Sequence, residues 1–427
     1  MKAPAQSPLK PRLCIGLPAP RPASLLLAAV LLLSLGTPAC RFEAKPRKRL
    51  TLALALFPGE SSRYRRFLED FERDRHVEIL IVAETYADIL YTVRAEAAAG
   101  RGVVDVAELD LALLGAARGG MHRLDGLETA QAQALFPPAA WQAARRRGHL
   151  YFVPGRLMWQ AMIYNRLEVG RPPGTWEELA RFARAHPGKV ALKAARYDGL
   201  VCDLLPFLWG AGGSLRNPYA PGDYTALSFL AQLAPFLNPY SAVFREMPIL
   251  EAQMRGEVWI HFNWPFAMSY LASKGLAPRF ALSAPIPRGP AGRATVLGGG
   301  YLGIPKSAPH PRLARAFLRY LLSASAQRRL SRTLGWYGSL APEAGSTDAA
   351  LYAGFVAMAP YVRARPTIRN YLPLSERWQD AVRAVLFAGQ SPQAALNELG
   401  QTTAASQLAP AAGPERAAEA AGDGLPR

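Results

Sequence analysis

The order of the apolar segments between residues 50 and 120 constrains the fold of this chain more than any other feature. Three short, continuously apolar runs predict strands buried on both faces, and two segments with apolar residues at helical spacing lie between them. In chain order, these segments are 50–57, 64–71, 77–82, 86–99 and 103–109. This alternation predicts an α/β fold with a parallel sheet, in which ligands bind at the carboxyl ends of the strands.

The length and later elements predict a second domain. The chain has 427 residues, and at about 100–200 residues per domain this length indicates two. Thr175 and Glu178 form a capping box that opens a helix after a proline-rich break. From residue 401 onward the chain holds little apolar bulk, which predicts a disordered tail over 401–427.

The first 39 residues read as an export signal. The apolar run over 24–35 is shorter than the roughly 20 residues that span a bilayer, basic residues precede it, and small residues follow it. Cys40 comes directly after this leader, as in a lipoprotein processing site, which predicts lipidation of Cys40; plain cleavage after Ala39 is the alternative. The basic residues over 40–49 predict a tether beside anionic lipid. We therefore expect an exported protein, either periplasmic or anchored on the outer face of the cytoplasmic membrane.

Charge and motifs exclude several functions. The net charge is +18, but no nucleic-acid motif is present and no long basic block interrupts the folded part, so we interpret the charge as a solvated surface. The three cysteines form no C-x-x-C pair, the six histidines lie far apart, and neither a nucleophile elbow nor a phosphate-binding loop occurs. We expect no metal, no cofactor and no nucleic-acid partner.

Two carboxylates and two aromatic residues are candidate site residues. Glu108 and Asp110 have strand spacing and share one face, which fits an acid/base pair, a pair of acceptors for sugar hydroxyls, or a helix cap. Trp264 stands at a turn before a proline, and Tyr301 follows Gly298–Gly300. An aromatic face can cover the apolar face of a sugar ring, and the glycines indicate a close backbone approach to a ligand or a neighbouring strand.

Five segments, in this order and spacing, resemble the family 1 extracellular solute-binding proteins, the group of the maltose- and trehalose-binding proteins. The resemblance covers about residues 50 to 400. The segments are VPGRLMWQAMIYNR (153–166), PPGTWEELARFA (172–183), GEVWIHFNWPFAMSYL (256–271), the return crossing and helix pair over 283–330, and RPTIRNYLPLSERWQDAVRAVLFAGQSPQAAL (365–396).

The resemblance implies a two-lobed periplasmic-binding-protein fold of type II, with parallel-rich sheets flanked by helices and a hinge between the lobes. The first lobe would comprise 50–155 and 285–334, and the second lobe 156–284 and 335–400. The hinge would cross near Pro154–Arg156, return near Ala284–Pro287, and cross again near the end of the helix predicted over 325–334.

The resemblance also implies a ligand site in the cleft between the lobes. It includes acids on the rim of the first lobe, aromatic residues on the second, a glycine-rich loop and an arginine. These residues are Glu60, Glu108 and Asp110; Trp264 and Phe266; Gly299, Gly300 and Tyr301; and Arg365, with Arg369 as the alternative.

The function implied is that of a monomeric binding protein without chemistry of its own. It would capture a di- or oligosaccharide and deliver it to the permease of an ABC importer. Two alternatives stay open: an exported hydrolase that acts on glycans through Glu108 and Asp110, and a sensor or scaffold lipoprotein with a degenerate cleft.

Overall fold

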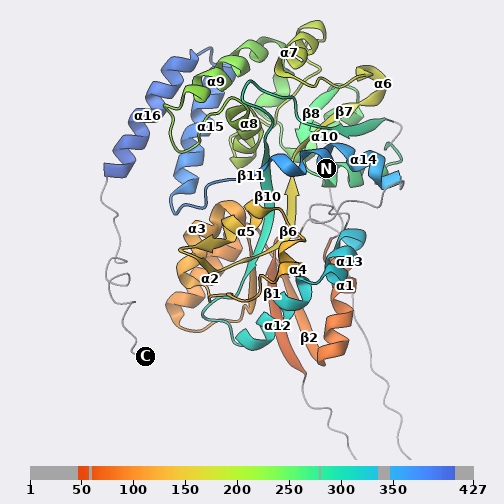
Figure 1. The fold of residues 1–427 in the computed structure, drawn as a ribbon, viewed down its shortest axis with the longest axis vertical. Coiled ribbons are helices and arrows are strands. Elements are labelled where there is room, and N and C mark those ends of the chain that lie inside the picture. The colour runs from red at the N-terminus through yellow and green to blue at the C-terminus, as the bar shows by residue number, and fades with distance from the viewer. Residues whose placement is uncertain (1–46, 57–59, 278–279, 335–346, 409–427) are drawn as a thin grey trace, which may run out of the picture. The chain divides into compact units, whose positions relative to one another are not determined.

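The computed structural model (Figure 1) describes four stretches of the chain, which are residues 47–56, 60–277, 280–334 and 347–408. The expected signal peptide and Cys40 lie outside these stretches. Within them, no helix is both long and apolar enough to cross a membrane.

A six-stranded sheet holds the strands predicted near the amino terminus (Figure 1). β1 pairs in parallel with β2 on one side and β3 on the other. β10 is antiparallel to both β3 and β6, and β11 runs parallel to β10. The strands are β1 (Lys48–Leu54), β2 (Val77–Ala83), β3 (Val106–Asp110), β6 (Val153–Trp159), β10 (Thr295–Gly303) and β11 (Val362–Ala364).

Helices α1 (Glu60–Arg75) and α2 (Tyr86–Ala99) connect the parallel strands, as the sequence predicts. The Thr85 side chain caps α2 by accepting a hydrogen bond from the backbone N–H of Asp88, and Gly100 ends it with φ 66°. The apolar face of α1 is buried as its spacing predicts, through Tyr64, Phe67, Leu68 and Phe71.

A second, three-stranded sheet lies in the other part of the fold (Figure 1). Its central strand β7 (Ala161–Asn165) is antiparallel to both β8 (Ile260–Asn263) and β9 (Ala281–Ala284). Helices α8, α9, α15 and α16 pack on one another beside this sheet. The longer helices that follow α2 along the chain are α7 (Trp176–Ala185), α8 (Asp198–Gly210), α9 (Pro221–Leu233), α10 (Glu246–Met254), α11 (Phe266–Ser273), α12 (Pro311–Leu321), α13 (Ala324–Leu334), α14 (Thr347–Met358), α15 (Tyr371–Phe387) and α16 (Pro392–Leu408).

The chain passes from the large sheet to the small one at Gln160, between β6 and β7. The side-chain amide of Gln160 donates a hydrogen bond to Asp203 (2.9 Å), and the backbone carbonyl of Gln160 accepts one from the hydroxyl of Thr295 (2.7 Å). Gln160 is therefore tied to α8 and to β10 at once. The lobe boundaries implied by the resemblance stay a prediction.

Three details differ from the segments expected from the sequence. β1 begins at Lys48, inside the expected tether, because its first residues pair with the start of β2. β11 lies within 335–400, which the resemblance assigns to the second lobe, yet it pairs with β10 in the large sheet. α16 continues past Gln401 to Leu408, where we expected disorder, because no glycine or proline interrupts that stretch.

The glycine run Gly298–Gly300 lies within β10, against a neighbouring strand. Gly299 has φ 108°, a conformation that disfavours side chains, and a Cβ atom there would overlap the carbonyl of Arg156 on β6. The close approach to a neighbouring strand, one of the two interpretations of this run, is confirmed.

Replacement of Gly299 by alanine is expected to destabilise the fold strongly. The variant combines an unfavourable φ, at about 1–2 kcal/mol, with an overlap that β6 must move to relieve. Gly389→Ala is the matched control, because Gly389 also has positive φ (69°) but has no atom within 4 Å of an added Cβ. Urea unfolding of both variants measures the difference, and equal losses would contradict the packing described for Gly299.

Candidate functional site

A buried cluster around Arg156 occupies the carboxyl end of the large sheet. Arg156 lies on β6, and its guanidinium binds Glu108 on β3 in a bidentate manner, with Nε–Oε1 at 2.5 Å and Nη2–Oε2 at 2.7 Å. It also reaches Glu60 at the start of α1 (3.4 Å) and the carbonyl of Ala55 just after β1. Burial lowers the pKa of Arg156, but Glu108, Tyr86 and Glu60 together outweigh burial and raise that pKa well above its usual range.

A second cluster surrounds Arg365, which follows β11. Its Nη2 donates to both carboxylate oxygens of Asp110 at the end of β3, at 2.8 and 3.0 Å, and its Nη1 pairs with Asp198 at the start of α8. The hydroxyls of Tyr371 (2.8 Å) and Ser375 (2.5 Å) on α15 donate to the other oxygen of Asp198. Arg365 thus joins a carboxylate of the large sheet to one held by the helices beside the small sheet.

The four carboxylates of these clusters differ in their access to solvent. The side chains of Glu60 and Glu108 are 5% and 2% exposed, whereas those of Asp110 and Asp198 are 21% and 27% exposed. Only the two aspartates can therefore offer an oxygen to an incoming ligand without rearrangement. The structure does not support Glu60 and Glu108 as direct ligand acceptors, because Arg156 and the backbone N–H of Ala55 already satisfy them.

Glu108 and Asp110 serve two different clusters although they stand two residues apart. Asp110 also accepts a hydrogen bond from the backbone N–H of Ala112 (2.8 Å), so the helix-cap interpretation of this residue is confirmed. Each carboxylate is bound by its own arginine. The two side chains therefore do not form the pair of free acids that a hydrolase would require.

The expected aromatic residues have different environments. Trp264 directly follows β8, is 9% exposed, and packs so closely on β10 that a Cβ atom on Gly298 would lie 2.8 Å from its ring. Phe266 begins α11 and is half-buried. Tyr301 is fully buried, and its hydroxyl donates to the carbonyl of Ala140 (3.2 Å), so in this structure it belongs to the core rather than to a surface that a ligand can reach.

The expected glycines and arginines of the site also differ in their surroundings. Gly299 faces β6, and an added Cβ on Gly300 would overlap the carboxylate of Glu108, so neither glycine lines open space. Arg369 is exposed, whereas Arg365 is buried between its two aspartates.

Sequence reasoning missed Asp198, Tyr371 and Ser375. The two hydroxyl residues lie on α15, which begins at Tyr371, and both donate to Asp198. Their spacing of four residues, which places two hydroxyls on one helix face, was a signal that could have been used. Arg156 lay within a quoted motif, but no role was predicted for it.

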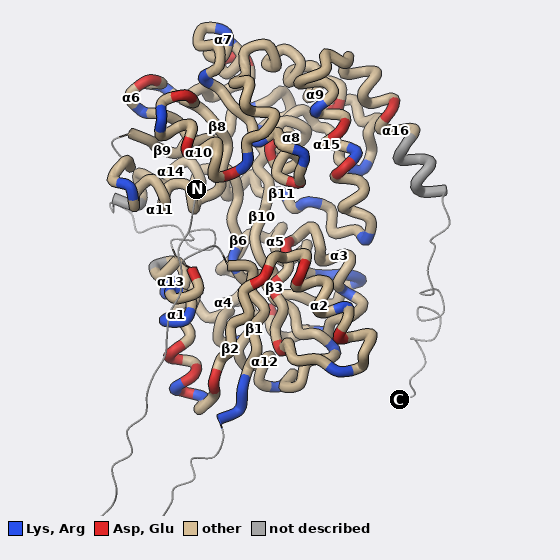
Figure 2. The backbone as a smooth tube through the Cα atoms, turned by 180° about the vertical axis from the view of Figure 1, so that it is seen from behind, with Lys and Arg blue, Asp and Glu red and all other residues tan. Residues whose placement is uncertain are grey.

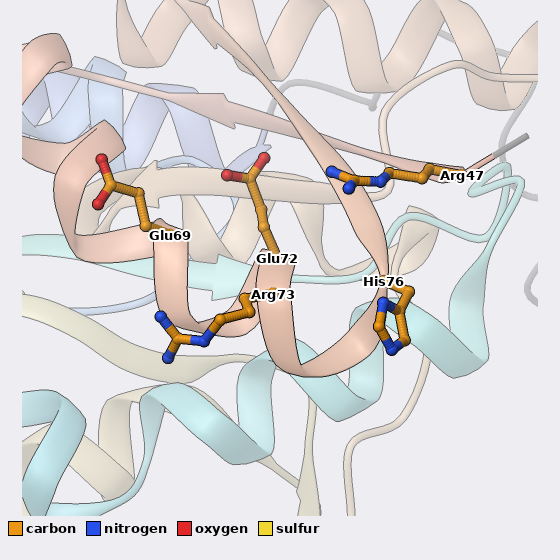
Figure 3. Close-up of a pocket in the computed structure, with 5 residues that line it drawn as sticks. All are labelled: Arg47, Glu69, Glu72, Arg73 and His76. Carbon is orange, nitrogen blue, oxygen red and sulfur yellow. The ribbon is translucent and has the colours of Figure 1, made fainter. Parts of the chain in front are cut away.

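A surface hollow of about 350 Å³ lies elsewhere (Figure 3). It opens beside Arg47, at the amino end of β1, whereas both arginine clusters lie at the carboxyl end of the sheet. The other residues that line it are Glu69, Glu72 and Arg73, in the last turns of α1, and His76, which directly follows α1. We do not assign it to the ligand site. Within the described stretches, no three potential ligands are grouped to hold a metal ion.

Comparison with known proteins agrees with this architecture. Residues 66–359 match the family described as bacterial extracellular solute-binding protein. The fold is similar to maltose-bound MalE3 of T. maritima (23% identity, TM-score 0.70, 84% of this chain and 99% of that chain). It is also similar to the cyclic alpha-maltosyl-1,6-maltose binding protein of Arthrobacter globiformis (18%, 0.72, 84% and 98%) and to a solute-binding protein of Agrobacterium radiobacter K84 in complex with ribitol (19%, 0.66, 83% and 98%). The two-lobed α/β fold is thereby confirmed.

Loss of the Arg156 side chain is expected to destabilise the protein. Arg156→Met leaves Glu60 and Glu108 buried without their cation, which costs about 3–5 kcal/mol for a buried pair. The double variant Arg156→Met/Glu108→Gln is expected to be more stable than Arg156→Met, because an amide carries no charge to be buried.

The matched control is Arg49→Met, which breaks an ion pair with Glu78 that is more than half exposed on both sides. An exposed ion pair contributes about 0–1 kcal/mol to the free energy of unfolding. This variant should therefore unfold at nearly the same denaturant concentration as the native protein. Guanidinium unfolding compares all three variants. A similar small loss in Arg156→Met and Arg49→Met would show that the Arg156 cluster does not stabilise the fold.

Proposed function

This chain belongs to the bacterial extracellular solute-binding protein family, and on that premise we propose that it captures a sugar in the cleft between its lobes and delivers it to an ABC importer. The family is extracellular, so the protein is exported. Its members and the similar structures are binding proteins rather than enzymes.

The observation that carries the proposal is the pair Asp110 and Asp198. These partly exposed carboxylates come from the two parts of the fold and are held in place by one buried cation, Arg365. Carboxylate oxygens are strong acceptors for hydroxyl donors, and acceptors fixed before binding lose little entropy when the ligand arrives. A polyhydroxylated ligand fits this arrangement, and Trp264 is the aromatic residue that we propose to contact it.

The similar proteins support a sugar or polyol as the ligand class. One is bound to maltose, one is named for binding a cyclic maltosyl-maltose, and one is in complex with ribitol. A ligand that contacts Asp110 and Asp198 together would favour the closed arrangement of the lobes, because contacts on both sides select that state. The closed form would then dock on the membrane subunits of the importer.

The site supports binding better than hydrolysis. A glycan-acting hydrolase would need an acid and a base free to exchange protons with the substrate, and Glu108 is enclosed by Arg156. A sensor or scaffold with a degenerate cleft would bind no small solute. A thermal-shift screen of sugars, with a product assay on every hit, separates the three functions.

The site residues are tested by titration calorimetry with the best hit of that screen. Asp198→Asn is expected to weaken binding by about 1.5–3 kcal/mol, the range for a hydrogen bond to a charged group. Trp264→Ala is expected to weaken it by about 1–3 kcal/mol through the loss of a large apolar face.

Asp380→Asn is the control, because Asp380 also pairs with an arginine but is 58% exposed on the outer side of α15. Its affinity should equal that of the native protein. If Asp198→Asn and Trp264→Ala keep native affinity while their melting temperatures fall, both residues are structural and the site lies elsewhere.

We also propose that Cys40 is the lipidated amino terminus, which would hold the protein beside the permease on the outer face of the membrane. Intact-mass analysis of protein extracted from membranes is expected to give a mature chain that begins at Cys40 and carries the mass of a lipid. A soluble mature form without that mass would reject the anchor and leave sugar binding untouched.

A further inference from the structure

Arg118 is a buried arginine without a counter-ion. It begins a short 3-10 turn (Arg118–Gly120), and the residue is only 7% exposed. Its Nε is buried without a hydrogen-bond partner, and no carboxylate of the described structure forms an ion pair with its guanidinium. By contrast, Arg156 and Arg365 each meet two carboxylates. A buried charge is costly unless an opposite charge accompanies it, so Arg118 demands an explanation.

The charged group that most affects Arg118 is another arginine, whose repulsion raises the cost of burying Arg118. Burial, and after it the charge of Arg146, lower the pKa of Arg118, and Tyr151 is the group that opposes them. Arg146 lies on the hairpin of β4 (Arg145–Arg146) and β5 (His149–Leu150). Arg146 is exposed, with no ion pair to any described residue. The charged and titratable groups that act on Arg118 are thus a second guanidinium and a phenol, and no carboxylate is among them.

The acids that lie near Arg118 in the sequence form pairs with other residues. Between residues 111 and 152 the sequence has only two, Asp125 and Glu128. Asp125 pairs with His149 (3.0 Å), and Glu128 binds Arg145 (3.0 Å). The segment carries five arginines against these two acids. The segment thus has a local excess of positive charge, to which Arg118 and Arg146 belong.

Space is available beside Arg118. A Cβ atom added to either Gly119 or Gly120 would have no other atom within 4 Å. The space on the side-chain face of these two glycines is therefore open, while the carbonyl of Gly120 accepts a hydrogen bond from the backbone N–H of Lys306 (2.8 Å). A small group can therefore approach this turn from solvent.

From these observations we propose that Arg118 and Arg146 form an anion-binding site, separate from the sugar site, for the phosphate group of a free phosphate or of a lipid headgroup. Guanidinium groups bind phosphate oxygens through paired, charge-assisted hydrogen bonds. The Tyr151 hydroxyl is a further donor at the site. A bound oxyanion supplies the charge that Arg118 lacks and replaces the water that its burial removes.

Inorganic phosphate is the first probe. At constant ionic strength, exchange of chloride for phosphate is expected to raise the melting temperature of the native protein, because an anion that binds only the folded state stabilises it. Arg118→Met is expected to weaken phosphate binding about ten-fold or more in calorimetry, since a charge-assisted contact is lost. In phosphate-free buffer this variant should melt no lower than the native protein, because methionine keeps the packing and removes an uncompensated charge.

Arg181→Met is the matched control. It removes the same charge from an exposed position on α7 and should leave phosphate binding unchanged. Arg146→Met provides a second test, because this exposed side chain can be removed without harm to the core, and it too should weaken phosphate binding. No phosphate-specific stabilisation of the native protein, or equal phosphate affinity in the Arg118, Arg146 and Arg181 variants, would overturn the proposal.

The source of the phosphate is resolved with a second probe, glycerophosphoglycerol, the soluble headgroup of phosphatidylglycerol. Tighter binding of this phosphodiester than of inorganic phosphate identifies a lipid headgroup, and the reverse order identifies a free anion. Sugar affinity in Arg118→Met should stay within about two-fold of the native value, because the contacts of Asp110 and Asp198 are untouched. Failure of the anion site and failure of the sugar site are therefore separate results.

Discussion

The pairing of Arg156 with Glu108 fixes the edge of the large sheet on which the candidate site is built. One guanidinium gathers a carboxylate from β3, a carboxylate from α1 and a carbonyl that follows β1. Because these groups come from four separate chain segments, their mutual attraction sets the positions of the strand ends. The cluster also buries Glu60 and Glu108 against Arg156. Of the four carboxylates, only Asp110 and Asp198 therefore remain accessible to a ligand.

The three buried arginines of the described structure illustrate how context determines what a buried charge does. Arg156 is fully neutralised and holds structure. Arg365 is neutralised by two acids from different parts of the fold, which stay partly open to solvent. Arg118 has no acid at all. The net charge of +18 reveals none of these differences, and basic residues are spread over most elements of the backbone (Figure 2).

Sequence reasoning predicted the α/β fold and most element positions, because apolar spacing and turn residues are local signals. It named Asp110 and Arg365, which the structure brings together, but it did not foresee that Glu60, Glu108 and Tyr301 are buried, since burial depends on which distant segment covers a residue. Asp198 was missed for the same reason: its importance arises from Tyr371 and Ser375, which lie more than 170 residues away in the chain.

The contact between Gly300 and Glu108 has a consequence for how this protein can change over time. The carboxylate of Glu108 occupies the volume that any side chain at position 300 would need. A substitution at Gly300 is therefore tolerated only after Glu108 has been replaced by a shorter residue. That replacement in turn releases Arg156 from its strongest partner. Substitutions at these positions are therefore ordered. Glu108 changes first, which leaves Arg156 without its main partner, and Gly300 changes last.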